Sequence, residues 1–131
     1  MKKKAALSIS FLASLLPMLL NQYGGMKGVQ EITGLVNLFN PIGVIAVITF
    51  FAGVFMKLEE RNVNRIMCAI GTVGIVISEV YKFFTWHVMT ITGEISLKNS
   101  LRFAFPEFYI GLAVSLMMII VYFFIERNVK E

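Results

Sequence analysis

The sequence predicts an all-α membrane protein, built as a bundle of four transmembrane helices. Of the 131 residues, 57% are hydrophobic and 15% are charged, whereas soluble domains are about half apolar and about a quarter charged. Four long apolar runs are separated by shorter polar segments, and a helix needs about 20 mostly apolar residues to cross a bilayer. The runs show no alternation of period two, which argues against the strands of a membrane barrel.

The first run, Ala5–Leu20, follows the sequence Met-Lys-Lys-Lys and at first resembles a secretory signal. No pair of small residues suited to cleavage follows Leu20, so we expect a retained anchor helix. Pro17 lies near the outer end of this run, and proline disrupts the hydrogen bonding of a helix. We therefore expect the outer end to bend.

The other three runs are continuous enough to form one helix each. They are Pro41–Met56, then Ile66–Phe84 with an extension toward Thr90, and finally Glu107–Ile125. We expect each of them to cross the membrane once.

The basic residues predict that both chain ends lie in the cytoplasm, because Lys and Arg beside transmembrane helices are retained on that side. One side of the four runs has Lys2, Lys3, Lys4, Lys57, Arg61, Arg65, Arg127 and Lys130, and the other has at most Lys27, Lys82, Lys98 and Arg102. This topology explains the net charge of +4. The basic residues form no stripe or patch of the kind that binds nucleic acid, so no nucleic-acid partner is expected.

Both outer loops predict short amphipathic segments. In the first loop, Val29, Ile32, Val36 and Phe39 recur at helical spacing, which suits a helix that lies on the outer leaflet. The second loop has Leu97, Leu101, Ala104 and Phe105 as apolar positions, with Lys98 and Arg102 on the polar side. Such loops could cap the bundle, lie on lipid or offer a docking surface.

Aromatic residues gather where the outer boundary of the membrane is expected. They are Tyr23, Tyr81, Trp86, Phe103, Phe105 and Tyr109. Aromatic rings favour the headgroup level of a bilayer, so we expect these side chains at that boundary. His87 follows Trp86 and is either an interfacial residue or a pH sensor.

We expect a single membrane domain, residues 1–131, in which a weak repeat is present. Glu-Arg-Asn-Val occurs at residues 60–63 and again at residues 126–129, in each case after an apolar run. One interpretation is coincidence within a biased composition. The alternative is a duplicated pair of helices, with tandem halves 1–63 and 64–131 arranged about an axis along the membrane normal.

Small residues mark the faces through which the helices should pack. Helices in lipid associate where small side chains let their backbones approach. The predicted packing residues are Gly43, Gly53, Gly71, Gly74, Ser78, Gly111 and Ser115. Packing alone explains these residues.

Glu79 is the candidate site within the membrane. It is the fourteenth residue of the third run, counted from Ile66, and a charge at that depth is expensive and often functional. Lys82 follows three residues later on the same helical face, so the two side chains can pair. The pair is either a proton or ion site or a structural ion pair near the interface.

The composition excludes most catalytic and metal chemistry. The chain has one cysteine, Cys68, one histidine, His87, and no aspartate. A disulfide, a multi-histidine metal site and an aspartate-held Mg²⁺ site each need residues that are missing. No phosphate-binding glycine loop, nucleophile elbow or paired-histidine zinc helix occurs. We therefore expect no catalytic residues, no metal, no cofactor and no enzymatic activity.

Two families are similar in size and in the expected number of spans. The small multidrug exporters resemble the chain in size and in having a membrane glutamate. They have that glutamate in the first helix, whereas here Ser78-Glu79-Val80 lies in the third run and the first has no acid. Small immunity proteins against pore-forming bacteriocins are similar only in length and number of spans.

Two functions remain open. The first is a multi-pass protein of the bacterial inner or plasma membrane, which contacts the lipid bilayer and binds a membrane-protein partner or further copies of itself. It would be an accessory subunit or have an immunity-like role. The alternative is a small oligomeric transporter or channel that uses Glu79 and Lys82 as a proton or ion site.

Overall fold

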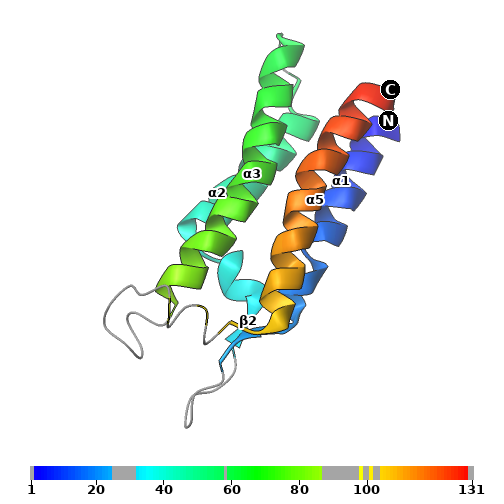
Figure 1. Cartoon of the computed structure of the whole chain (residues 1–131). Helices are drawn as coiled ribbons and strands as arrows, with labels where there is room; N and C mark the ends of the chain where they lie inside the picture. Colours follow the sequence, from blue (N-terminus) through cyan, green and yellow to red (C-terminus); the bar gives the residue numbers. More distant parts are fainter. Residues whose placement is uncertain are drawn as a thin grey trace.

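Four α-helices account for most of the residues that the structure describes (Figure 1). The computed structural model describes residues 2–24, 32–57, 59–86, 98, 101 and 104–129. The helices are α1 (Lys2–Ser14), α2 (Pro41–Phe55), α3 (Arg61–Thr85) and α5 (Pro106–Asn128). Between α1 and α2 lie two 3₁₀ helices, η1 (Leu16–Leu19) and η2 (Gly34–Asn37), and two strands, β1 (Asn21–Tyr23) and β2 (Ile32–Thr33). The predicted helical class is confirmed, with a small sheet that the sequence did not suggest.

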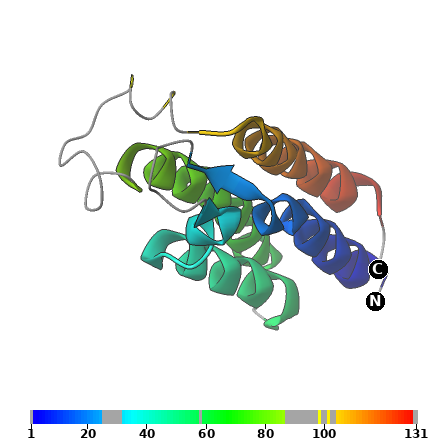
Figure 2. The same cartoon turned by 90° about the horizontal axis from the view of Figure 1, so that it is seen from below.

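The helices lie in two pairs, which Figure 2 shows from below. α2 packs along α3 in the most extensive helix contact, and α1 packs along α5. A Cβ atom added at Gly71 would lie 2.9 Å from the carbonyl oxygen of Ala46, and one added at Gly74 would lie 2.8 Å from the Ala46 Cβ atom. Both distances are shorter than a Cβ atom can approach another heavy atom without a shift of one of them. Glycine at these positions therefore lets α2 and α3 approach closely.

The first predicted run forms a shorter α-helix than expected. α1 ends at Ser14, and the chain continues as η1, which contains Pro17. Proline has no amide hydrogen for the bond to residue i−4, and its ring crowds the preceding turn. The change from α to 3₁₀ geometry therefore occurs where the sequence places its proline.

The segment before α2 differs from the amphipathic helix that its spacing predicted. Residues 32 and 33 form β2, which pairs antiparallel with β1, and residues 34–37 form η2. Hydrogen bonds to the first part of the chain cause this difference: the amide of Gly34 donates to the carbonyl of Leu20 at 2.9 Å. The predicted helix is wrong at residues 32 and 33, which form a strand, and residues 34–37 are helical only as a short 3₁₀ segment. Most of the second outer loop lies outside the described residues.

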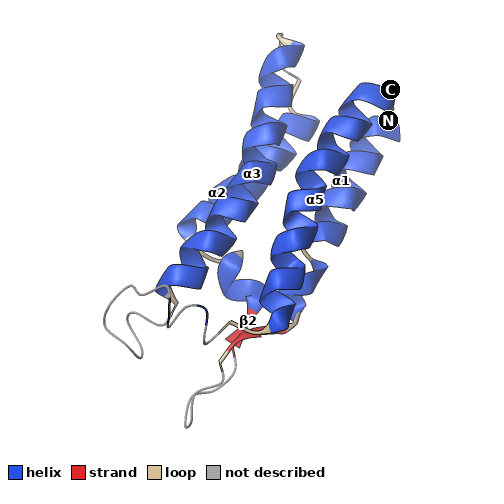
Figure 3. Ribbon diagram, in the orientation of Figure 1, coloured by secondary structure: helices blue, strands red, loops and turns tan. Residues whose placement is uncertain are grey.

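The sheet closes one end of the bundle, opposite the chain termini (Figure 3). We call this the sheet end. Tyr23 of β1 also forms a bridge with Ala104, and the amide of Phe105 donates to the carbonyl of Gln22 at 2.8 Å. The sheet thus joins the segment after α1 to the segment that leads into α5.

Local signals in the sequence explain how α2 begins and how it is linked to α3. Asn40 is the N-cap of α2, where its side chain accepts a hydrogen bond from the amide of Gly43 at 3.0 Å, and Pro41 occupies the first helical position. After α2, the Asn64 amide group donates to the carbonyls of Gly53 and Met56 at 2.9 and 2.8 Å. These bonds hold the short link between the two helices.

Two of the described helices are long and apolar enough to cross a membrane. They are the spans Asn62–Thr85 and Pro106–Asn128. α2 is apolar but has 15 residues, about 22 Å at 1.5 Å per residue. α1 has 13 residues. The four-span arrangement is therefore supported by only two helices on the grounds of length and composition.

The two chain ends lie together at the other end of the bundle, which we call the terminal end (Figure 1). One oxygen of Glu126 in α5 accepts hydrogen bonds from the amino group of Lys3 and from Nε of Arg65, both at 2.7 Å. This group of three charges joins α1, α3 and α5. It ties the beginning of the described chain to the end of its last helix.

Candidate functional site

Glu79 lies inside the bundle toward the sheet end, with 2% of its surface exposed. Its Oε1 atom accepts a hydrogen bond from the hydroxyl of Ser115 in α5. Its Oε2 atom is buried and has no hydrogen-bond partner among the residues that the structure describes. The structure thus brings together a residue predicted as a charged site and one predicted as a packing residue.

Lys82 is placed differently from the predicted pair. Within the described part of the chain the ion pairs join Glu126 to Lys3 and Arg65, and none joins Glu79 to Lys82. The Lys82 amino group lies 5.7 Å from the centroid of the Tyr81 ring. Sequence spacing alone allowed the pair, but Glu79 faces α5, where a hydroxyl is available. A long lysine side chain can instead extend along the surface of its helix.

Asn37 is the centre of a second group of buried polar side chains. The Tyr23 hydroxyl donates to its side-chain oxygen at 2.6 Å, and its amide nitrogen donates to the side-chain oxygen of Gln22 at 2.6 Å. Gln22 in turn donates to the carbonyl of Pro17 at 2.9 Å. Asn37 and Tyr23 are fully buried and Gln22 is 1% exposed. These bonds attach β1 to η2 in the interior.

Asn40 and Ser78 extend these hydrogen bonds to α3. The Asn40 amide group donates to the Ser78 hydroxyl at 2.7 Å and to the backbone carbonyl of Asn37 at 2.9 Å. The Ser78 hydroxyl also donates to the carbonyl of Asn37. Because Ser78 precedes Glu79, the two groups of polar side chains meet on adjacent residues of α3.

We call these side chains together the polar cluster. Its members are Gln22, Tyr23, Asn37, Asn40, Ser78, Glu79 and Ser115, and all are buried. They come from β1, η2, α3, α5 and the residue that caps α2. Buried polar groups are costly unless they are hydrogen-bonded. The hydrogen bonds of the cluster therefore fix the position of β1 and η2 relative to the helices.

Tyr23 is held as a hydrogen-bond donor by its surroundings. Burial raises the pKa of its phenol well above the usual range, the hydrogen bond to Asn37 opposes this shift, and negative charge at Glu79 adds to it. The hydroxyl therefore keeps its proton at any physiological pH. It remains available to donate to Asn37.

Aromatic rings enclose the cluster on one side. Tyr23 stacks on Trp86 with ring centroids 5.2 Å apart, and Phe108 stacks on Phe83 at 5.0 Å. Tyr23 and Trp86 were expected at the membrane boundary, but both are buried. Their depth in a membrane remains a prediction, and the structure adds that β1 carries Tyr23 into the interior of the protein. His87, predicted to be near the outer surface, lies outside the described residues.

Gln22 is fitted tightly between two glycines. A Cβ atom added at Gly34 would lie 2.7 Å from the Gln22 side-chain oxygen, and one added at Gly111 would lie 3.0 Å from its nitrogen. Gly111 was predicted as a contact between helices. Here it leaves room for a polar side chain that comes from β1.

The other predicted packing residues lie at backbone contacts. A Cβ atom added at Gly53 would lie 2.9 Å from the amide nitrogen of Cys68, and one added at Gly43 would lie 2.9 Å from the carbonyl of Asn37. Gly71 and Gly74 face Ala46 across the α2–α3 contact. Ser78 and Ser115 are instead hydrogen-bond donors in the polar cluster.

Four members of the cluster were not predicted as site residues, and Tyr23 among them was expected only as an aromatic residue at the membrane boundary. Asn40 had a readable signal, since an asparagine directly before a proline is typical of a helix start. Gln22 and Asn37 had none, because each is a single polar residue in a loop. Gln22 and Asn37 bond to each other although they lie 15 residues apart in the chain, so only the fold brings them together.

The cluster has the groups for hydrogen bonding and for holding a proton or cation at Glu79. Among the described residues, no three histidine, cysteine, aspartate or glutamate side chains meet as a metal site. Cys68 is buried between α2 and α3, where its sulfur lies 3.7 Å from the Phe50 carbonyl oxygen. Glu79 supplies the carboxyl group of the polar cluster.

Comparison of the chain with family models, with curated proteins and with solved structures finds no match. The chemistry of the site is accordingly argued from its own residues.

The bond between Tyr23 and Asn37 should stabilise the fold measurably. We expect Tyr23→Phe to lower the free energy of unfolding by about 1 to 3 kcal/mol, because the Asn37 oxygen would be buried without its donor. In an Asn37→Leu background the same substitution should have little effect. Chemical denaturation in detergent micelles, followed by helicity, measures the coupling between the two residues, which we expect to be about 0.5 to 3 kcal/mol.

Tyr81→Phe is the matched control, since Tyr81 is exposed on α3. This variant should unfold like the natural protein. Equal losses from Tyr23→Phe with and without Asn37 would show that the hydrogen bond contributes nothing.

Proposed function

We propose that this chain is a four-span protein of the cell membrane that acts, without catalysing a reaction, by binding another membrane protein. Its role would be that of an accessory or immunity-like subunit, with both described ends in the cytoplasm. The observation that carries the proposal is a closed polar interior inside an apolar exterior that is hollowed between α3 and α5.

The exterior supports a place in lipid. Large apolar side chains point outward from every helix, among them Ile9, Leu12, Ile45, Ile48, Ile70, Ile77, Met117, Ile120 and Phe124. Ile120 is 70% exposed, whereas Glu79 is 2% exposed. A soluble protein has the reverse arrangement, and a bilayer is the solvent in which this one is favourable.

The short helices α1 and α2 are compatible with spans. α1 continues into η1, and α2 is preceded by the hydrogen-bonded segment of β2 and η2. Non-helical backbone is tolerated at membrane depth where it is buried in protein. Here the Gly34 and Phe105 amides bond to carbonyls of residues 20 and 22. A helix shorter than the bilayer core is also accommodated by local thinning.

The distribution of charge supports the proposed orientation. Lys2, Lys3, Lys4, Lys57, Arg65 and Arg127 all lie at or near the terminal end. Basic residues near transmembrane helices remain on the cytoplasmic side.

The orientation predicts which positions an impermeant reagent reaches. Single cysteines at Lys2, Glu59 and Asn128, in a Cys68→Ser background, should react only after the membrane is permeabilised. Lys98→Cys and Phe39→Cys should react in intact cells. All five positions are exposed in the structure, so burial does not explain a lack of reaction. Labelling of Lys2→Cys from outside the cell would contradict the four-span arrangement.

The hollow between α3 and α5 supports a partner. It has a volume of about 680 Å³ and is lined by Arg65, Ile66, Ala69, Tyr122, Phe123, Glu126 and Arg127. Ala69 contributes only a small side chain to its wall, and the charged residues lie at its terminal end. Helices in membranes associate by close packing and by a few polar contacts. A transmembrane segment of another protein fits this combination.

Photo-cross-linking in native membranes tests the partner. A photoreactive residue at Phe123 lines the hollow, and one at Ile45 lies on α2 outside it; both positions are exposed, at 57% and 62%. We expect a cross-linked product of one defined mass from Phe123 and none from Ile45. Products from lipid alone at both positions would overturn the proposal, and a product of twice the chain's mass would show that the partner is a second copy.

A proton or ion site is the second candidate function, favoured by the buried and unpartnered Oε2 atom of Glu79. An oligomeric transporter would need such a carboxylate at its pathway. Against this, Glu79 lines neither the hollow described above nor the pocket at the terminal end.

Glu79→Gln separates the two candidates. Under the first proposal this variant keeps the Phe123 cross-link and changes no ion flux in liposomes, since glutamine can still accept from Ser115. Loss of a pH-dependent flux that the natural protein supports would favour the transporter. Ser115→Ala is the control, because it alters the same contact and leaves the carboxylate in place.

A further inference from the structure

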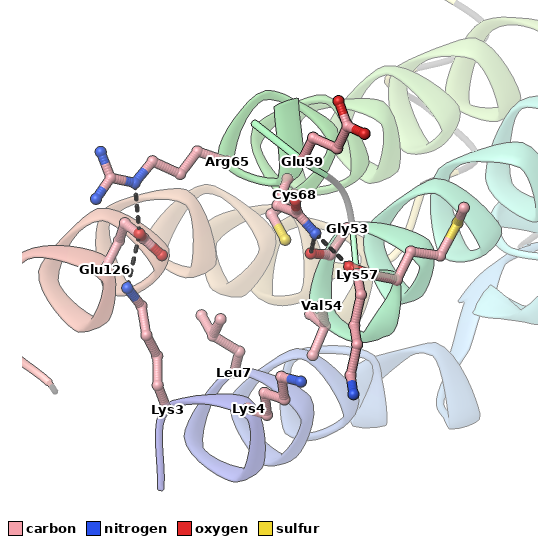
Figure 4. A pocket seen from close by; sticks show the side chains of 12 residues that line it. Lys3, Lys4, Leu7, Gly53, Val54, Lys57, Glu59, Arg65, Cys68 and Glu126 are labelled. Atoms are coloured by element: carbon pink, nitrogen blue, oxygen red, sulfur yellow. Dashed lines mark hydrogen bonds and ion pairs between the residues drawn. The ribbon is translucent and has the colours of Figure 1, made fainter. Parts of the chain in front are cut away.

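A second polar site lies at the terminal end, far along α3 from Glu79. A pocket of about 360 Å³ opens there between α1, α2 and α3 (Figure 4). Its lining includes four basic residues, Lys3, Lys4, Lys57 and Arg65, and two acidic residues, Glu59 and Glu126. Leu7 and Val54 give it apolar walls. The volume lies at the lower end of the range for small-molecule sites.

The two carboxylates do not neutralise the pocket. Glu126 is already bonded to both Lys3 and Arg65, at 2.7 Å each, so one negative charge serves two positive charges. Glu59 points away from the space between α1 and α2 in Figure 4. The pocket therefore has an excess of positive charge.

Lys4 and Lys57 are the basic residues of this pocket that have no ion pair within the described part of the chain. In Figure 4 both side chains extend on the side of the pocket away from Glu59 and Glu126. Lys4 lies in α1 and Lys57 in the link between α2 and α3, so an anion between them would be contacted from two sides.

The architecture holds this arrangement in place. The side chain of Lys3 is only 8% exposed, and its bond to Glu126 fixes the beginning of α1. The Asn64 amide group fixes the link in which Lys57 lies, through its bonds to the Gly53 and Met56 carbonyls. Lys4 and Lys57 therefore lie in segments that these bonds hold in place.

We propose that this pocket binds a phosphate group, through Lys4 and Lys57 with Lys3 beside them. The proposal rests on the orientation proposed above, which places the pocket at the cytoplasmic leaflet. Anionic phospholipids are concentrated in that leaflet, and basic pockets between transmembrane helices bind their headgroups. Lysine binds phosphate as a point charge. The phosphate belongs either to such a lipid or to a soluble phosphate ester.

Native mass spectrometry of the full chain, released from detergent, tests this proposal. Phosphatidylglycerol and phosphatidylcholine are added at equal concentration, and retention of each lipid is measured. We expect the natural protein to retain the anionic lipid, and Lys4→Gln/Lys57→Gln to lose affinity about thirtyfold, which corresponds to about 1 kcal/mol for each lysine. Lys2→Gln/Arg127→Gln removes the same charge at the same end outside the pocket, and should retain the lipid.

Two further arms complete the test. If the phosphate belongs to a soluble ester, glycerol 1-phosphate at millimolar concentration should raise the thermal stability of the natural protein. In that case the protein should retain the two lipids equally. Lys4→Arg/Lys57→Arg keeps the charge and should restore binding, which separates a binding loss from a folding defect.

Equal retention of phosphatidylglycerol by Lys4→Gln/Lys57→Gln and by Lys2→Gln/Arg127→Gln would overturn the proposal. So would a natural protein that responds neither to phosphatidylglycerol nor to glycerol 1-phosphate. Lipid retention and thermal stability are measured in detergent and do not depend on the orientation of the protein in a membrane. Binding can therefore be observed even if the cysteine-labelling experiment contradicts the proposed topology.

Discussion

The hydrogen bonds of Asn37 are the interaction on which the sheet end of this protein depends. Its side chain joins Tyr23 and Gln22, and its backbone carbonyl accepts from Ser78 and Asn40. One buried residue therefore connects β1, η2, the cap of α2 and α3. In an interior screened from water each of these polar groups must find its partner within the chain, so the positions of the helices and of the outer segment are fixed together.

The sequence predicts the helical content and most of the helix positions, because long apolar runs are local signals. α2 and α5 begin within a residue of the predicted runs, whereas α3 begins at Arg61, five residues before Ile66. The sheet and the polar cluster could not be predicted. In the sequence Tyr23 resembles an interfacial aromatic residue and Asn37 a surface residue. Both are buried because β1 pairs with β2 and packs against the helices, a contact that no local signal in the sequence predicts. The tandem halves 1–63 and 64–131 remain a prediction, and the α2–α3 contact crosses their boundary.

The two ends of the molecule solve the problem of buried polarity in different ways. At the sheet end the cluster is mostly uncharged, with amide and hydroxyl groups bonded to one another around a single carboxylate. At the terminal end the charges are balanced incompletely, because four basic residues and two acidic residues line the pocket and Glu126 alone pairs with two of the basic ones. The first arrangement is closed and specifies a structure. The second keeps unused charge, which is what a site for an anion requires.

The bond between Lys3 and Glu126 joins residues 123 positions apart. During synthesis α1 therefore lacks this bond until the ribosome has added α5. α1 docks against α5, and contacts of such long range form late in folding. α2 and α3, which are consecutive, can assemble as a hairpin beforehand. The order in which the two helix pairs mature is thus set by where their members lie along the nascent chain.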